Sequence, residues 1–185
     1  MYRGKRTDIS GMTKSALLIA MLCASSWFVI PVPFSPAVIS LHSIVINMVG
    51  MFLTPSQAII TVSIYLLMGV LGFPVFSGGV SGAAKLLSPV GGFYIGFLLS
   101  AWLISLSRGK KIFFLRYLLV MITAGMLVQH LSAVFFAAAY AGLTMMEAFA
   151  SISLPFLLFD TAKCVVSAMA AVAVKKALNN RGQEL

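Results

Sequence analysis

Residues 117–140 read Tyr-Leu-Leu-Val-Met-Ile-Thr-Ala-Gly-Met-Leu-Val-Gln-His-Leu-Ser-Ala-Val-Phe-Phe-Ala-Ala-Ala-Tyr, an apolar run without a single Asp, Glu, Lys or Arg. About 20 such residues in a helix cross the roughly 30 Å hydrocarbon core of a bilayer. Comparable runs lie on both sides of it, and the whole chain is 61% hydrophobic and only 9% charged. These features predict a membrane protein built of helices.

The apolar runs predict an all-α membrane protein in which residues 1–185 form one transmembrane domain. Six crossings and their connections nearly exhaust this length, so no soluble domain is expected. No small-residue cleavage site follows the basic start of the chain, so the first run is expected to remain as a helix. The expected spans lie near residues 14–30, 37–53, 57–72, 89–107, 116–140 and 155–177.

The basic residues give this bundle a direction, because cytoplasmic loops carry an excess of Lys and Arg. With both termini in the cytoplasm, all 13 basic residues except Lys85 and Lys163 fall on the cytoplasmic side or at its membrane edge. The formal net charge of +9 is therefore attributed to membrane orientation. Nucleic-acid binding is not expected, since the basic clusters lie beside apolar runs and have no aromatic context.

Asp160 and Lys163 are the only charged residues in the interiors of the expected spans. A lone charge at the bilayer centre costs about 3 kcal/mol, so such residues face the bundle interior and have partners. Their spacing puts them on one helical face. If the helix begins near Pro155, they lie about 8 and 12 Å from its external end. The ammonium can take a ligand carboxylate while Asp160 accepts N–H donors. The alternative is an ion pair that only locks the bundle.

A Gly-rich external loop is expected near residues 73–88, between the third and fourth spans. Its glycines would let the backbone approach a ligand and offer N–H groups to it, or they would simply make a flexible hairpin. Five other side chains have two open interpretations. His42, Gln129 and His130 are either interhelical hydrogen-bonding groups or ligand contacts. Phe93 and Tyr94 are either anchors at the membrane interface or walls of the cavity.

Ala16, Ala20 and Ala24 form a stripe of small residues at a spacing of four in the first span. Such a stripe lets another helix pack closely. The partner is either a helix of the same bundle or a separate membrane protein.

Four stretches carry a family resemblance. Residues 65–79 read Tyr-Leu-Leu-Met-Gly-Val-Leu-Gly-Phe-Pro-Val-Phe-Ser-Gly-Gly, and residues 154–163 read Leu-Pro-Phe-Leu-Leu-Phe-Asp-Thr-Ala-Lys. Residues 37–42, Ala-Val-Ile-Ser-Leu-His, and residues 88–97, Ser-Pro-Val-Gly-Gly-Phe-Tyr-Ile-Gly-Phe, add less specific support. From the first span to Leu178, the chain resembles BioY, the biotin-specific substrate-capture (S) component of energy-coupling factor (ECF) transporters.

This resemblance implies a six-helix bundle of the ECF S-component type in a prokaryotic plasma membrane, with an outward-facing, high-affinity biotin pocket under the loop after the third helix. It implies no cofactor and no enzymatic activity, because a transmembrane coupling (T) subunit and two ABC-type ATPases supply the energy. The alanine stripe would dock on the T subunit. The ligand contacts implied by the family are Asp160, Lys163, Ser77, Gly78, Gly79, Val80 and Gly82, with Phe93 and Tyr94 nearby.

Three departures from the family pattern bear on the ligand. Val80 stands where some members carry an Asn that contacts the ureido ring, so that hydrogen bond is absent or made elsewhere. His42 replaces Gln, while Ser88 and Val90 replace Gly and Thr. Another small carboxylate-bearing vitamin is therefore an alternative ligand.

Two other classes of function have less support. Residues 79–82, Gly-Val-Ser-Gly, fit the nucleophile motif of rhomboid intramembrane proteases, with His130 as the base for Ser81. However, Ser81 is expected in the external loop and His130 deep in its helix, whereas a dyad needs both within hydrogen-bond reach. A stand-alone secondary transporter would show an internal repeat, and none is evident. The sequence contains no Walker A motif, so any ATP coupling requires another polypeptide.

Overall fold

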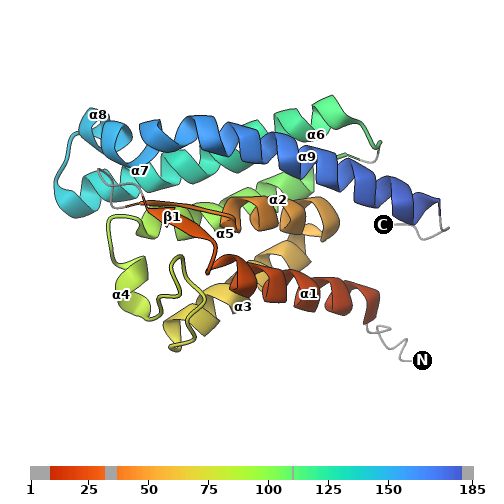
Figure 1. Cartoon of the computed structure of the whole chain (residues 1–185), viewed down its shortest axis with the longest axis horizontal. Helices are drawn as coiled ribbons and strands as arrows, with labels where there is room; N and C mark the ends of the chain where they lie inside the picture. The colour runs from red at the N-terminus through yellow and green to blue at the C-terminus, as the bar shows by residue number, and fades with distance from the viewer. Residues whose placement is uncertain (1–8, 32–36, 110, 181–185) are drawn as a thin grey trace, which may run out of the picture.

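A computed structural model describes residues 9–31, 37–109 and 111–180. These residues form a bundle of helices with one small β-hairpin (Figure 1). The first half of the chain contributes α1 (Ile9–Ser25), β1 (Val29–Pro31), β2 (Val38–Ser40), α2 (His42–Phe52), α3 (Pro55–Val70), α4 (Ala83–Leu86) and α5 (Gly91–Ser107).

The second half forms two long helical segments. The first runs through α6 (Phe114–Val120), the π-helical stretch η1 (Met121–Leu127) and α7 (Val128–Ala141). The second consists of α8 (Met145–Ala148), the π-helical stretch η2 (Phe149–Ser153), the 3₁₀ turn η3 (Leu154–Phe156) and α9 (Leu157–Asn179). Among the described residues, these two segments of 28 and 35 residues are long and apolar enough to cross a membrane. Shorter apolar helices overlap the other four expected spans, at Ile9–Ser25, His42–Phe52, Pro55–Val70 and Gly91–Ser107.

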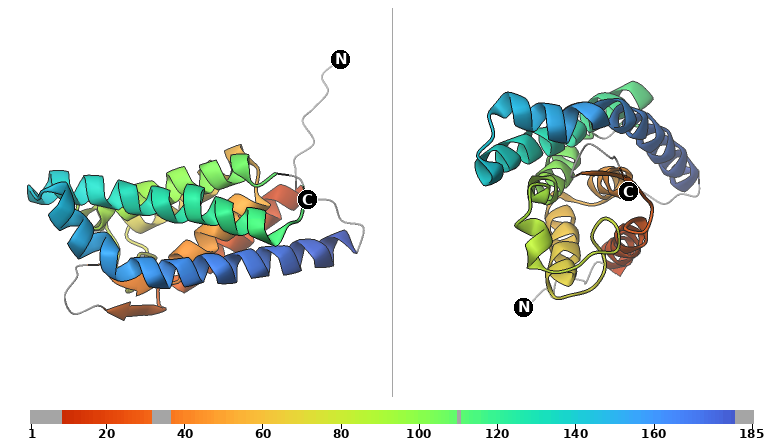
Figure 2. Two further views of the ribbon diagram at one scale, coloured as in Figure 1. Left: turned by 90° about the horizontal axis from the view of Figure 1, so that it is seen from above. Right: turned by 60° about the vertical axis from the view of Figure 1, so that its left-hand side comes forward.

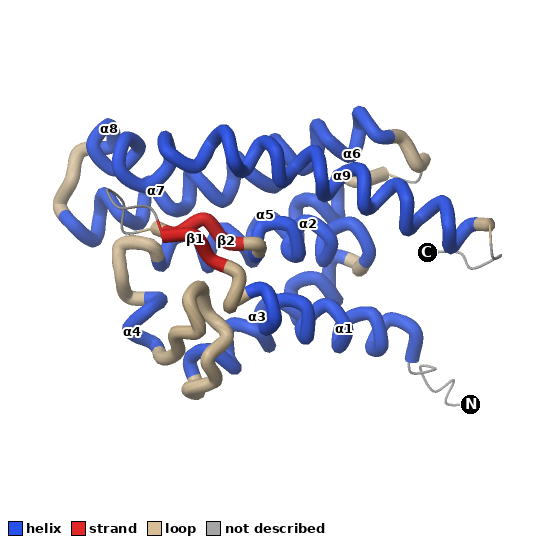
Figure 3. The backbone as a smooth tube through the Cα atoms, viewed as in Figure 1, coloured by secondary structure: helices blue, strands red, loops and turns tan. Residues whose placement is uncertain are grey.

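The first two spans were expected to be helical over residues 14–30 and 37–53. This prediction was wrong at the end of the first range and at the start of the second. Residues 29–31 and 38–40 instead pair as antiparallel strands, with Ile30 opposite Ile39 (Figure 3). Val29, Ile30, Val38 and Ile39 are β-branched and favour extended backbone. Pro31 lacks the N–H group that a continuing helix needs. The chain is therefore not purely α-helical, and α2 begins only at His42.

The sequence predicted that the last helical segment starts near Pro155. It begins ten residues earlier, at Met145, because Thr144 forms its N-cap. The Thr144 hydroxyl accepts a hydrogen bond from the Glu147 backbone, and the Glu147 carboxylate accepts one from the Thr144 backbone at 2.8 Å. This capping box satisfies two N–H groups at the helix start. Pro155 then interrupts regular α-helix, since it lacks an N–H group, and η2 and η3 lie at this interruption.

Helix α5 packs closely against α7 through two glycines. A Cβ atom on Gly92 would lie 2.4 Å from the carbonyl oxygen of Ser132, and one on Gly96 would lie 2.7 Å from the Cα of Gln129. Small residues of this kind let two membrane helices approach until their backbones touch. The contact brings side chains of α5 and α7 together beside the cavity described below.

The described ends of the chain lie at the same end of the bundle. The start of α1, the connection from α5 to α6 and the end of α9 lie together at the right of Figure 1 and again in the left view of Figure 2. The β-hairpin, α4 and α8 lie at the opposite end.

Candidate functional site

An open cavity with about 580 Å³ of empty space, part of it open to solvent, lies where the β-hairpin and the α4 loop meet α5, α7 and α9. One part of its lining is aromatic and apolar, and the rest carries hydroxyl, amide and charged groups. The lining residues are Ala37, Val38, Ser40, Ser43, Ser77, Lys85, Val90, Phe93, Tyr94, Phe97, Gln129, Phe156, Asp160 and Lys163.

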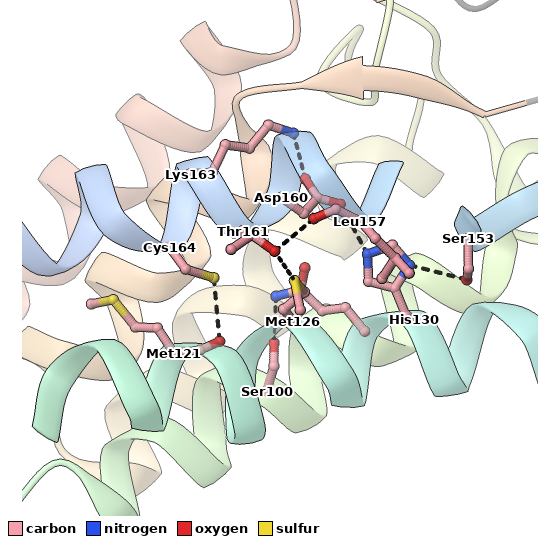
Figure 4. Close-up of polar contacts among 11 residues, drawn as sticks. Ser100, Met121, Met126, His130, Ser153, Leu157, Asp160, Thr161, Lys163 and Cys164 are labelled. Atoms are coloured by element: carbon pink, nitrogen blue, oxygen red, sulfur yellow. Dashed lines mark hydrogen bonds and ion pairs between the residues drawn. The ribbon is translucent and has the colours of Figure 1, made fainter. Parts of the chain in front are cut away.

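Asp160 is held by two basic side chains. The Lys163 ammonium donates to Oδ1 of Asp160 at 2.7 Å, and Nε2 of His130 lies 3.0 Å from Oδ2 (Figure 4). Nδ1 of His130 lies 3.0 Å from the Ser153 hydroxyl. An ionised carboxylate only accepts hydrogen bonds, so Nε2 donates, and in a neutral ring Nδ1 accepts from Ser153. We name this chain of contacts, Lys163, Asp160, His130 and Ser153, the polar cluster.

Local helix structure places the polar cluster. Asp160 lies in the first turn of α9, where the positive end of the helix dipole stabilises a carboxylate. Lys163 follows three residues later on the same face, as predicted from the spacing. Ser153 ends the π-helical stretch just before Pro155. The interruption at Pro155 thus lies between Ser153 and α9. The hydroxyl of Ser153 contacts His130 on α7.

Asp160 pairs with Lys163, as their spacing allowed. His130 makes an interhelical hydrogen bond, which was one of its two open interpretations, but the sequence did not predict Asp160 as its partner. The side chains of Asp160, Lys163 and His130 are 16%, 13% and 5% exposed. Asp160 and Lys163 line the cavity, whereas His130 is not among the lining residues. His130 therefore stands behind Asp160 and holds its carboxylate toward the cavity.

Phe93 and Tyr94 form walls of the cavity, together with Phe97 on the next turn of α5. The ring of Phe93 meets His130 edge to face at 5.7 Å, and the ring of Tyr94 meets Phe97 in the same way at 5.6 Å. The Tyr94 hydroxyl accepts a hydrogen bond from the backbone of Ser77 at 3.4 Å. Tyr94 therefore joins α5 to the loop that follows α3.

His42 lies behind this wall. Its side chain is fully buried, its ring stacks on Phe97 with an interplanar angle of 7°, and Nε2 lies 3.4 Å from the carbonyl oxygen of Val75. His42 is not among the cavity-lining residues, so the structure places it as a support for Phe97.

The glycines of the 73–88 loop shape its backbone. The N–H groups of Gly78 and Gly82 bond to the carbonyl oxygens of Ser26 and Gly69, at 2.9 and 2.7 Å. Gly79 has a φ of +68°, and a Cβ there would lie 3.2 Å from the ring of Trp27. These contacts use the N–H groups of Gly78 and Gly82 within the protein, and direct contact of the three glycines with a ligand stays a prediction.

Ser77 is the loop residue of the predicted set that lines the cavity. Val80 is 43% exposed and lines a separate outer depression with Ser81; this depression shares Lys85 and Val90 with the cavity. The loop also contains α4, whose Lys85 lines both the cavity and the depression.

Several cavity residues were not predicted from the sequence. Ala37, Val38, Ser40 and Ser43 come from the hairpin and the start of α2, a region expected to be a membrane helix. Lys85 had a signal, since it is the one basic residue expected in an external loop. Val90, Phe97 and Phe156 carry only apolar character, which sequence reasoning could not distinguish from ordinary core packing. Gln129 differs from these residues because the sequence named it as an interhelical hydrogen-bonding group or a ligand contact; it lines the cavity and donates to the Ser100 hydroxyl of α5 at 3.0 Å.

The alanine stripe is exposed. Ala16, Ala20 and Ala24 all lie on the outer face of α1, while Leu18 and Leu22 on its other face are buried. The described part of the chain therefore leaves the stripe without a packing partner inside the bundle.

The geometry gives the Ser81–His130 dyad no support. Both ring nitrogens of His130 are engaged by Ser153 and Asp160, and Ser81 lies on the outer depression. No hydrogen bond joins Ser81 to His130 in the described part of the chain.

Comparisons with known proteins agree on one family. The model of the BioY family matches residues 3–180. A biotin transporter BioY of Thermotoga maritima is 30% identical over 165 residues, which cover 89% of this chain and 95% of that protein. A probable biotin transporter BioY of Pyrococcus horikoshii is 31% identical over 156 residues, which cover 84% of this chain and 90% of that protein. The crystal structure of the S-component for biotin from an ECF-type ABC transporter matches with a TM-score of 0.81, over 95% of both chains at 23% identity, and this likeness shows the fold.

Proposed function

Because the chain belongs to the BioY family, we propose that it captures biotin in the cavity beside the polar cluster, as the substrate-specific component of an ECF-type uptake transporter. The family consists of transporter components, so the protein is a binding and transport subunit and not an enzyme. Its ligand is a substrate, and no cofactor is required.

The single observation that supports biotin most strongly is the polar cluster beside an aromatic wall. Biotin has a ureido ring with two N–H donors and a carbonyl acceptor, fused to an apolar thioether ring, and a tail that ends in a carboxylate. A carboxylate has about four lone-pair sites, and the cluster uses two of those on Asp160, which leaves acceptors for the ureido N–H groups. Lys163 gives one of its three donors to Asp160 and keeps others for the ureido carbonyl.

The aromatic wall suits the apolar part of the same ligand. Phe93, Tyr94 and Phe97 lie on one face of α5 and line the cavity next to the polar cluster. Aromatic side chains bury large apolar areas and fix the orientation of a ring placed against them. Val80, the position where some relatives carry Asn, lies outside the cavity. We therefore assign the ureido contacts to Asp160 and Lys163 and none to Val80.

We place the protein in the plasma membrane of a prokaryote as a multi-pass protein with six spans and both termini in the cytoplasm. The common position of the α1 start, the α5–α6 connection and the α9 end supports this topology, because these segments also carry most of the basic residues. The cavity then opens toward the outside, under the loop that contains α4.

The coupling partners belong to the same proposal. A T subunit would pack on the exposed stripe of Ala16, Ala20 and Ala24, because small residues allow close helix contact. Two ABC-type ATPases bound to that subunit would supply the energy, since this sequence has no Walker A motif.

A competition experiment tests the identity of the substrate. Membranes that contain the protein are incubated with labelled biotin and an excess of unlabelled biotin, lipoate, nicotinate or pantothenate. We expect unlabelled biotin alone to displace the label, since only biotin carries the ureido ring that matches the polar cluster. Displacement by another carboxylate-bearing vitamin at equal concentration would favour the alternative that the pocket serves that vitamin.

A further inference from the structure

Lys85 lies between the cavity and the outer depression. It belongs to α4 and lines the cavity together with Asp160 and Lys163, and it also lines the outer depression together with Val80 and Ser81. Within the described residues, Lys85 and Val90 are the two that line both spaces. Any ligand that enters from the depression therefore passes this side chain.

The backbone around Lys85 is fixed to the rest of the loop. The carbonyl oxygen of Lys85 accepts a hydrogen bond from the Ser88 hydroxyl at 2.7 Å, and its N–H donates to Gly82 at 3.2 Å. Gly82 in turn donates to Gly69 at the end of α3 at 2.7 Å. The base of the Lys85 side chain is therefore held between the cavity and the depression, while its ammonium remains on a long and adaptable stem.

The ammonium of Lys85 has no acidic partner in the described residues. Two of the four acidic residues are described, Glu147 and Asp160. Glu147 caps α8, and both oxygens of Asp160 are engaged by Lys163 and His130. Asp160 balances the charge of Lys163, so the lining of the cavity carries one positive charge in excess, and that charge is on Lys85.

We propose that Lys85 binds the carboxylate of the captured ligand, in the same cavity as the ureido subsite. This assignment rests on the proposed function, because it takes biotin as the ligand. It revises the simplest interpretation of the sequence, in which Lys163 takes the carboxylate. Lys163 is instead paired with Asp160, and Lys85, which has no acidic partner among the described residues, attracts the anionic tail.

The test compares two ligands that differ only in the group at the end of the tail, which is charged in one and neutral in the other. Biotin and biotinol, in which a primary alcohol replaces the carboxylate, are titrated by calorimetry into purified wild-type protein and the Lys85→Gln variant. A charged hydrogen bond contributes on the order of tenfold or more in affinity. We expect Lys85→Gln to weaken biotin binding by about this factor and to leave biotinol binding unchanged. Lys85→Arg should retain most of the preference for biotin.

Lys176→Gln is the matched control, since Lys176 is an exposed lysine near the far end of α9, and it should change neither affinity. Unchanged biotin binding by Lys85→Gln, or an equal loss for both ligands, would overturn the carboxylate assignment while leaving the proposed function in place. If the wild type bound neither ligand, the proposed function would fail and the role of Lys85 with it.

Discussion

The Nζ atom of Lys163 lies 2.7 Å from Oδ1 of Asp160, one helical turn away on α9, at the edge of the cavity. Each of the two side chains supplies the charge that the other needs in a partly buried position. Removal of either partner leaves an uncompensated charge, which is strongly unfavourable away from water. This relationship makes the pair sensitive to conservative substitutions.

Asp160→Asn is expected to weaken biotin binding by at least about a hundredfold, because it removes the acceptor of the ureido N–H groups and leaves Lys163 without its partner. Calorimetry on purified protein measures the loss. Glu147→Gln is the control, since it removes the same charge from the exposed cap of α8 and should leave binding intact. Wild-type affinity in Asp160→Asn would refute the assignment of this carboxylate to the site.

The two members of the pair should also act together. Lys163→Met keeps the length of the side chain and removes its charge, and we expect it to lower biotin affinity as well. In the double variant with Asp160→Asn, the losses should fall short of their sum by about 0.5–3 kcal/mol, since the second change removes a partner that is already missing. Strictly additive losses would mean that the two side chains contact the ligand independently.

His130 acts on the ligand through Asp160, so substitutions that keep its hydrogen bond should be tolerated. His130→Leu is expected to weaken biotin binding by about tenfold, because one oxygen of Asp160 loses its donor. His130→Gln can present an amide N–H in place of Nε2 and should recover most of the affinity. Equal losses in the two variants would show that ring shape, rather than the bond to Asp160, is what matters.

Gly96→Val should destabilise the bundle, because its Cβ would lie 2.7 Å from the Cα of Gln129 on α7. Overpacking of this kind costs about 1–3 kcal/mol and would separate α5 from α7. We expect a lower melting temperature in detergent and weaker biotin binding, measured by a thermal shift assay with and without biotin. Leu99→Val on the exposed face of α5 is the control and should melt near the wild type.

Ala20→Phe should separate binding from transport. The substitution adds bulk to the exposed stripe on α1, and Ala20 is not a residue of the cavity lining, so purified protein should bind biotin normally. Uptake by cells that also produce the T subunit and the ATPases should fall to near background. Met21→Phe places the same ring at an exposed neighbouring position outside the stripe and should transport normally. Normal uptake by Ala20→Phe would reject the docking face.

The sequence predicted the parts of the site that depend on one helix. Asp160 and Lys163 could be paired from their spacing and from the cost of isolated charges in a membrane, and their contact is confirmed. The link from His130 to Asp160 joins residues 30 positions apart on different helices, and no local pattern encodes which helices face each other. The roles of Asp160, Lys163 and His130 in ligand binding stay predictions.

The hairpin shows a different reason for failure. Hydropathy does not distinguish a short apolar strand from a membrane helix, so Val38 and Ser40 were assigned to a span although they line the cavity from a strand. The β-branched residues beside Pro31 were a usable signal of extended backbone. Capping of α8 by Thr144 and Glu147 was likewise visible in the sequence, since Thr-x-x-Glu is the pattern of a capping box, but it was not used to predict the helix start.

Calorimetric titration of biotin into the purified wild-type protein tests the central claim most directly. We expect one biotin bound per chain with a dissociation constant below about 1 µM, and the loss of that binding in Asp160→Asn. Absence of saturable biotin binding to folded wild-type protein would contradict it.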